Sequence, residues 1–282
     1  MTVSASTTPS VEAFGAPAGI AAEAMELARV FAAGGRLVVA APARHDHARH
    51  VAVEFVHPAI TGARALPAMA TGVEDLPAMV TARDAVLIIA PPDGVETVSV
   101  PAARLVLRVG GRERPLSGSG LVRWYHLLWE LVQLGLEHPG ITGGSAAAGG
   151  DATDFLYPFL DAAESDSGAL LADLTTSATA KLTESDELSR RTVDDNANSL
   201  DNAAADLAQR AAAGGTVFAI GNGGSACDAA RLVRLLTAKG VRAVSLADDP
   251  AVLTALANDL GADMIFSRQV EAALTPLDAL VA

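Results

Sequence analysis

The fold is decided by one stretch of the sequence, Gly214-Gly215-Thr216-Val217-Phe218-Ala219-Ile220-Gly221-Asn222-Gly223-Gly224-Ser225-Ala226-Cys227-Asp228. Its apolar part, residues 216–220, is typical of a short buried strand, and residues 225–228 begin a helix. The glycines between them let the backbone approach a ligand closely. Free amides at a helix start, beside a serine hydroxyl, suit an anion such as a phosphate. A tight turn that binds nothing explains the stretch equally well, so other parts of the chain must decide its function.

The composition is that of a folded, acidic protein. Half of its 282 residues are hydrophobic, 19% are charged, and the net charge is −13. Nucleic acid and anionic membrane are therefore not expected as partners, because both require clustered Lys and Arg. Cys227 is the one cysteine, which excludes an internal disulfide and indicates a cytoplasmic location. Residues 1–18 lack the features of a signal peptide and are expected to form a flexible tail.

Two segments carry the alternating strand and helix pattern of a parallel sheet with helices on both faces. In the first, residues 19–138, we predict strands at 37–40, 65–70, 84–90 and 104–109 and helices at 19–33, 44–56 and 122–136. In the second, residues 154–282, we predict two or three helices before 213, strands at 216–220 and 242–246, and helices ending near 238 and 260. Residues 139–153 are small with nothing to bury, which predicts an interdomain linker.

The two segments also match each other, with a period of about 180 residues. Matched pairs are 27–28 with 207–208, 32–35 with 212–215, 62–65 with 240–243, and 84–88 with 278–282. The second module is therefore expected to be truncated inside its third strand. Three alternatives explain this: a fragment of a longer chain, a module completed by another chain, or a half-built domain.

Several motifs resemble one family. In the second segment they are Gly-Asn-Gly-Gly-Ser-Ala at 221–226, Asp249-Pro250 with Leu-Thr-Ala-Leu-Ala-Asn-Asp at 253–259, and Phe-Ser-Arg-Gln-Val at 266–270. In the first they are residues 50–58, 64–68 and 126–132. Together they resemble the SIS (sugar isomerase) domain of the sedoheptulose 7-phosphate (phosphoheptose) isomerase group. The resemblance implies two flavodoxin-like, three-layer α/β/α modules with parallel sheets, the second truncated. It also implies a homo-oligomer or a pseudo-symmetric assembly of the two modules.

The same resemblance implies an aldose–ketose isomerisation of a sugar phosphate. That reaction needs a base for the proton beside the carbonyl and an acid for the enediol oxygen. The family's catalytic glutamate and histidine match Glu54 and His126. Some members also bind zinc, and three of the four ligand positions match His50, Glu54 and His126, while the fourth, a glutamine, is Gly118 here. Zinc is thus compatible with the sequence but not required, because a His and a Glu four residues apart also form an ordinary helical pair.

Two more histidines precede these residues. His45 and His47 are expected to lie in a loop and to be solvated, without a role as ligands.

The two modules have lost different parts of the family pattern. The predicted sugar-phosphate site is in the second module, at Gly221, Asn222, Gly223, Gly224, Ser225, Asp249, Asn258 and Asp259. In the first module, Pro42 stands in the corresponding loop and residues 91–94 replace the second phosphate loop. In the second module, Arg231 and Leu235 occupy the histidine and glutamate positions. The sequence therefore leaves two hypotheses: a phosphoheptose isomerase-like enzyme, or a non-catalytic sugar-phosphate sensor or protein-binding scaffold.

Overall fold

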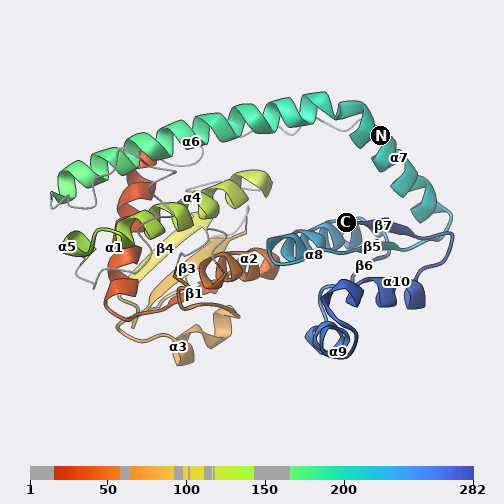
Figure 1. The fold of residues 1–282 in the computed structure, drawn as a ribbon, viewed down its shortest axis with the longest axis horizontal. Coiled ribbons are helices and arrows are strands. Elements are labelled where there is room, and N and C mark those ends of the chain that lie inside the picture. The colour runs from red at the N-terminus through yellow and green to blue at the C-terminus, as the bar shows by residue number, and fades with distance from the viewer. Residues whose placement is uncertain are drawn as a thin grey trace. The chain divides into compact units, whose positions relative to one another are not determined.

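The computed structural model describes residues 16–57, 64–91, 98–100, 102–110, 116, 118–142 and 166–282 (Figure 1). The chain divides into two compact units, and the division falls between Arg191 and Thr192. Most of the predicted tail and linker lies outside the described residues. None of the described helices combines the length and the apolar character that a membrane crossing requires.

The first unit contains a four-stranded parallel sheet in the order β2-β1-β3-β4. Its elements in chain order are α1 (Pro17–Ala32), β1 (Leu37–Ala40), α2 (His45–Val56), β2 (Ala68–Thr71), the 3₁₀ helix η2 (Val73–Asp75), α3 (Leu76–Met79), β3 (Ala85–Ala90), β4 (Leu105–Gly110), α4 (Gly118–Leu136), α5 (Pro139–Thr142) and most of α6 (Ser167–Asp195). All four predicted strands are present, and β2 begins three residues later than expected. The predicted α/β class with parallel sheets is confirmed.

Buried side chains lie on both faces of this sheet. Successive residues of a strand point to opposite faces, so Leu37 and Val39 of β1 join one core and Val38 and Ala40 join the other. The larger core contains side chains of α1, α2, α4 and α6, and the smaller one contains Leu76 at the start of α3. The short apolar run of β1 is therefore buried along its whole length, as expected for a central parallel strand.

Helix α6 belongs largely to the first unit. Its side chains at every fourth position, Leu170, Leu174, Ala178 and Leu182, lie in the larger core with α1 and α4. Lys181 Nζ also contacts Glu130 Oε1 of α4 at 2.5 Å, and Arg123 of α4 pairs with Asp186. The division thus differs from the predicted module boundary at residue 153, because the apolar stripe of α6 packs against helices that precede it in the chain.

Replacing Leu174 with alanine should lower the stability of the first unit by about 2–3 kcal/mol. The cost is at the lower end for a buried leucine because α6 packs through one face and can move toward the gap. Denaturant unfolding followed by tryptophan fluorescence measures it, since Trp124 and Trp129 are the chain's two tryptophans and both are on α4. Leu188→Ala, at an exposed position of the same helix, is the control. Equal effects of the two substitutions would contradict the packing of α6.

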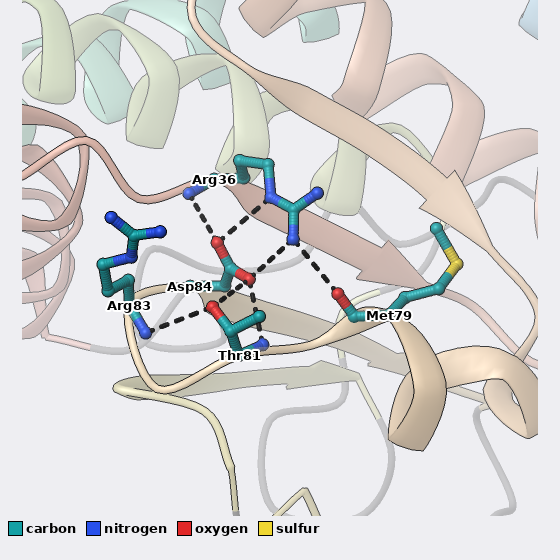
Figure 2. A network of polar contacts seen from close by, with 5 residues as sticks. All are labelled: Arg36, Met79, Thr81, Arg83 and Asp84. Carbon is teal, nitrogen blue, oxygen red and sulfur yellow. Dashed lines mark hydrogen bonds and ion pairs between the residues drawn. The ribbon is translucent and has the colours of Figure 1, made fainter.

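A buried carboxylate ties together the edge of the sheet where β1 and β3 begin (Figure 2). Asp84 is 2% exposed. Its Oδ1 accepts hydrogen bonds from the backbone N (3.0 Å) and Nε (3.2 Å) of Arg36, and its Oδ2 accepts from Arg36 Nη2 (2.9 Å) and from the backbone N (2.9 Å) and Oγ1 (2.8 Å) of Thr81. Arg36 also reaches the carbonyl oxygen of Met79 at 3.1 Å. The bond from Arg36 is the main cause that holds the pKa of Asp84 well below its usual range.

The second unit contains a three-stranded parallel sheet in the order β6-β5-β7. Its elements are α7 (Ala197–Ala212), β5 (Val217–Ala219), α8 (Gly224–Thr237), β6 (Ala243–Ser245), α9 (Pro250–Leu260), the 3₁₀ helix η3 (Ala262–Met264), α10 (Ser267–Ala273) and β7 (Ala279–Val281). In order and pairing, β5, β6 and β7 correspond to β1, β2 and β3. Residues 192–282 contain no counterpart of β4.

The same turn joins helix to strand in both units. Asp278 repeats the amide and hydroxyl bonds of Asp84: Oδ1 accepts from the backbone N of Thr216 at 2.7 Å, and Oδ2 accepts from the backbone N and Oγ1 of Thr275 at 2.7 and 2.8 Å. A Cβ on Gly35 would lie 2.0 Å from the Arg83 carbonyl oxygen, and one on Gly215 would lie 2.2 Å from the Leu277 carbonyl oxygen. Residues matched by the predicted repeat therefore make the same close contacts in each unit.

Candidate active site

Helices α2 and α4 of the first unit pack against each other and carry the candidate site. His50 and Glu54 are four residues apart on α2, so both lie on one face of that helix. His126 projects from α4 toward the same point, where it contacts both residues. The structure thus brings together the three residues that were predicted as catalytic groups and as metal ligands.

The three side chains form a nearly equilateral triangle of donor atoms. His50 Nε2 is 3.3 Å from Glu54 Oε1, His126 Nε2 is 3.6 Å from the same oxygen, and the two imidazole nitrogens are 3.4 Å apart. In the described part of the chain, His50, Glu54 and His126 are the one set of at least three His, Cys, Asp or Glu side chains placed closely enough to hold a metal ion. Each distance is longer than the about 2.7–2.9 Å of a charge-assisted hydrogen bond.

The carboxylate of the triangle is ionised at neutral pH. Hydrogen bonding to His126, and then to His50, lowers the pKa of Glu54 to about 2, while partial burial acts in the opposite direction. His50 is 4% exposed, whereas the side chain of His126 is 46% exposed. A ligand therefore reaches the site from the side of His126.

A tyrosine of α4, Tyr125, lies directly behind His50. The hydroxyl of Tyr125 is 2.8 Å from Nδ1 of His50, and the two rings meet edge to face with centroids 5.0 Å apart. Consecutive helical residues are about 100° apart around the axis, so Tyr125 and His126 can both face α2. Its position beside a candidate catalytic residue was the signal available in the sequence.

The prediction for His45 and His47 was wrong in part. Both belong to the first turn of α2, because the helix begins at His45. His45 is exposed as expected, but His47 is 3% exposed, and its ring lies edge to face with Tyr125 at a centroid distance of 6.2 Å. The face of α2 that carries His50 and Glu54 extends one turn further back, to His47, and this turn is covered by α4.

A cavity of about 230 Å³ opens beside His126, between α4 and α6. Its polar lining comes from Arg123, His126, Glu130, Lys181, Glu184 and Ser185. Charged and hydroxyl groups of this kind can hydrogen-bond a ligand that carries many hydroxyls. The cavity was not foreseen from the sequence, because α6 was assigned to the other module.

The predicted phosphate loop in the second unit connects β5 to α8. Gly221 lies so close to the following turn that a Cβ would be 2.4 Å from the Ser225 carbonyl oxygen, and Gly223 has a φ of +54°. The backbone N of Ser225 donates to the Asn222 carbonyl at 3.0 Å, and the Ala226 N donates to the Gly223 carbonyl at 3.1 Å. Two of the amides at the start of α8 are therefore engaged within the loop, while Ser225 itself is exposed.

The other predicted substrate-binding residues lie on α9 (Asn258 and Asp259) or directly before it (Asp249), and all three are exposed. Asp249 caps this helix, because Oδ1 accepts from the amides of Ala251 at 2.9 Å and Val252 at 3.2 Å. The side-chain amide of Asn258 donates to Asp259 at 2.9 Å. Within the described residues, no hydrogen bond joins Asn258 or Asp259 to the loop at 221–225. Their role in substrate binding stays a prediction.

The first unit has a different loop at the position of the phosphate cradle. Residues 41–44 form a turn in which Ala43 has a φ of +56°, a left-handed conformation that usually requires glycine. Pro42 contributes no amide donor. The predicted replacement of the second phosphate loop, residues 91–94, lies outside the described residues except for Pro91.

Part of this chain is similar in sequence to phosphoheptose isomerases. No protein-family model matches the chain. Curated phosphoheptose isomerases are similar over a short segment: the one from Geotalea daltonii is 42% identical over 81 residues, covering 27% of this chain and 42% of the relative. The enzyme from Pectobacterium atrosepticum is 43% identical over 84 residues, covering 28% and 43%. This chain therefore spans less than half the length of the curated relatives it matches.

Two solved structures are also similar. Phosphoheptose isomerase from Neisseria gonorrhoeae has 34% sequence identity and a TM-score of 0.37, over 38% of this chain and 58% of that chain. The C-terminal domain of glucosamine-fructose-6-phosphate aminotransferase from Francisella tularensis has 10% identity and a TM-score of 0.44, over 96% and 86%. The sequence identity to the curated enzymes shows that about a quarter of the chain is homologous to phosphoheptose isomerases, and the predicted resemblance is confirmed for that part.

Proposed function

We propose that this chain binds a sugar phosphate and interconverts its aldose and ketose forms at the site formed by His50, Glu54 and His126. The observation that carries this proposal is the triangle of donor atoms with edges of 3.3, 3.4 and 3.6 Å. The partial homology to phosphoheptose isomerases supports the choice of substrate class.

The triangle fits a zinc ion. When a tetrahedral zinc is bound at about 2.0–2.1 Å, neighbouring ligand atoms are about 3.3–3.4 Å apart, which is close to all three edges. Two histidines and one glutamate are a known ligand set of catalytic zinc sites, which keep the fourth position open for water or substrate. The absence of the family's glutamine, with Gly118 at that position, is compatible with such an open site. His50, Glu54 and His126 would hold the ion, and zinc would supply polarisation of the substrate carbonyl.

The side chains supply the proton transfers. Glu54 is ionised, and one of its carboxylate oxygens, Oε2, is not part of the triangle. This oxygen takes the proton from the carbon beside the carbonyl and returns it to the neighbouring carbon. In the metal-free site His126, which lies at the exposed side, protonates the enediol oxygen and recovers a proton from the adjacent hydroxyl. The sum is an isomerisation, with no external oxidant or reductant.

The sugar chain would lie in the cavity beside His126. Its polar lining offers donors from Arg123 and Lys181 and acceptors from Glu130 and Glu184, which matches a chain of hydroxyl groups. Both cations are paired with carboxylates, so this cavity is better suited to hydroxyls than to a phosphate group.

A non-catalytic sugar-phosphate sensor is the second candidate. It is favoured by the loop at 41–44, where Pro42 and the absence of serine remove the usual phosphate donors beside the catalytic pair. In that case the chain would bind the sugar phosphate without converting it.

The test is an isomerase assay with sedoheptulose 7-phosphate on the metal-free chain and on the chain with added zinc. We expect formation of the corresponding aldoheptose phosphate, faster with zinc. A thermal shift with the substrate but no product in either sample would support the sensor. Neither a shift nor product would contradict both sugar-phosphate functions and favour the protein-binding scaffold.

A further inference from the structure

We infer that Tyr125 is a positioning residue. Its hydroxyl holds the ring of His50 and accepts a hydrogen bond from the proton on Nδ1 of that ring, which leaves Nε2 free to bind a metal. This inference rests on the proposed function, because it concerns the same site. It goes beyond that proposal by assigning a role to a side chain that touches neither the substrate nor the metal.

The contact between the two side chains is short and dry. The Tyr125 hydroxyl is 2.8 Å from His50 Nδ1, Tyr125 is 0% exposed and His50 is 4% exposed. The residues come from α4 and α2, so the bond also fixes the distance between the helices that carry His126 and Glu54. Because water has little access to this contact, a water molecule cannot take over the hydrogen bond to His50 when the hydroxyl is removed.

The chemistry of imidazole explains why His50 needs such a neighbour. A neutral imidazole carries one proton, and the nitrogen that binds a metal must be free of it. In the triangle Nε2 of His50 faces Glu54 and His126, so binding through Nε2 places the proton on Nδ1. The oxygen of Tyr125 is in position to accept a hydrogen bond from that proton, as the second neighbour of a metal-binding histidine usually does.

A phenol differs from the carboxylate or carbonyl that more often occupies this place, because its hydroxyl both donates and accepts. Without a metal, Tyr125 donates to a bare Nδ1 while the proton on Nε2 points to Glu54. When a metal binds, the proton lies on Nδ1, and the tyrosine oxygen accepts a hydrogen bond from this N–H group. Both states keep the two rings in place, so the site does not have to rearrange.

Removing only the hydroxyl tests this role. For Tyr125→Phe we expect zinc binding, measured by competition with a chromogenic chelator, to weaken about 10- to 100-fold. The control is Val132→Ala, which removes buried volume from the same helix about two turns beyond Tyr125 and should leave zinc affinity unchanged. Equal affinity of the parent and Tyr125→Phe, or an equal loss in the control, would overturn the inference.

A second measurement separates this inference from the proposed function. Nitrogen NMR of ¹⁵N-histidine-labelled protein reports which nitrogen of His50 carries the proton, with His50→Gln used to assign its signals. In the metal-free chain we expect the Nδ1 signal to change in Tyr125→Phe, and with zinc we expect the parent to carry the proton on Nδ1. If the parent binds no zinc, the metal part of the proposed function fails, while the metal-free spectra still decide the contact. Unchanged His50 signals in Tyr125→Phe would overturn the positioning role.

Discussion

Replacing Glu54 with glutamine is expected to lower kcat for the isomerisation by about 10²–10⁴-fold. Glutamine keeps the shape of the side chain but carries no negative charge and cannot take the proton beside the carbonyl. It also removes the anionic ligand of the triangle, so zinc affinity should fall together with activity. Steady-state kinetics with sedoheptulose 7-phosphate and a chelator competition with zinc measure the two effects separately.

The matched control is the same substitution at Glu26. This residue lies on α1 of the same unit, where its exposed side chain pairs with Arg29 at 2.5 Å. Glu26→Gln should leave both activity and zinc affinity unchanged. Full activity of Glu54→Gln, or an equal loss in Glu26→Gln, would remove Glu54 from the proposed mechanism.

Replacing Asp84 with alanine is expected to lower the free energy of unfolding of the first unit by about 3–5 kcal/mol. The substitution removes the acceptor of five hydrogen bonds from Arg36 and Thr81, and it leaves two backbone amides, one just before β1 and one in the turn before β3, without this partner. Denaturant unfolding followed by tryptophan fluorescence measures the change. Asp278→Ala, which removes the equivalent carboxylate of the second unit, should leave this transition in place.

The stability of the parent and of Asp84→Ala should respond differently to acid. The pKa of Asp84 is lowered in the folded chain, mainly by Arg36, so the unfolded state binds the proton more readily. Its contribution to stability is complete above the unfolded pKa of about 3.9 and is lost as the pH falls below that value. The parent should therefore lose more stability than Asp84→Ala between pH 5 and pH 2, and parallel curves would contradict this role.

The sequence was sufficient to predict the sheets because their strands are short, continuous apolar runs buried on both faces. The runs at 37–40 and 84–90 are examples. Gly35, before the first run, leaves no room for a Cβ beside the Arg83 carbonyl oxygen, and Asp84, which begins the second, accepts the hydrogen bonds of the turn. The internal match of Asp84 with Asp278 also pointed to equivalent positions, and the structure gives both carboxylates the same set of amide and hydroxyl partners.

Other features depend on contacts between distant segments and could not be predicted in this way. The stripe at Leu170, Leu174, Ala178 and Leu182 is visible in the sequence, but its spacing does not say which helices it packs against. The roles of His47 and Tyr125 depend on how α2 and α4 meet. By contrast, His50, Glu54 and His126 were identified from a family resemblance, and the structure places them together.

The position of α6 has a consequence for synthesis of the chain on the ribosome. The larger core of the first unit includes Leu182, so it cannot close when α4 ends at Leu136. At about 5–20 residues per second, several seconds pass before the missing helix is made. During that interval the apolar surface of α1 and α4 is available to chaperones, and the first unit completes its folding only as the second begins to be translated.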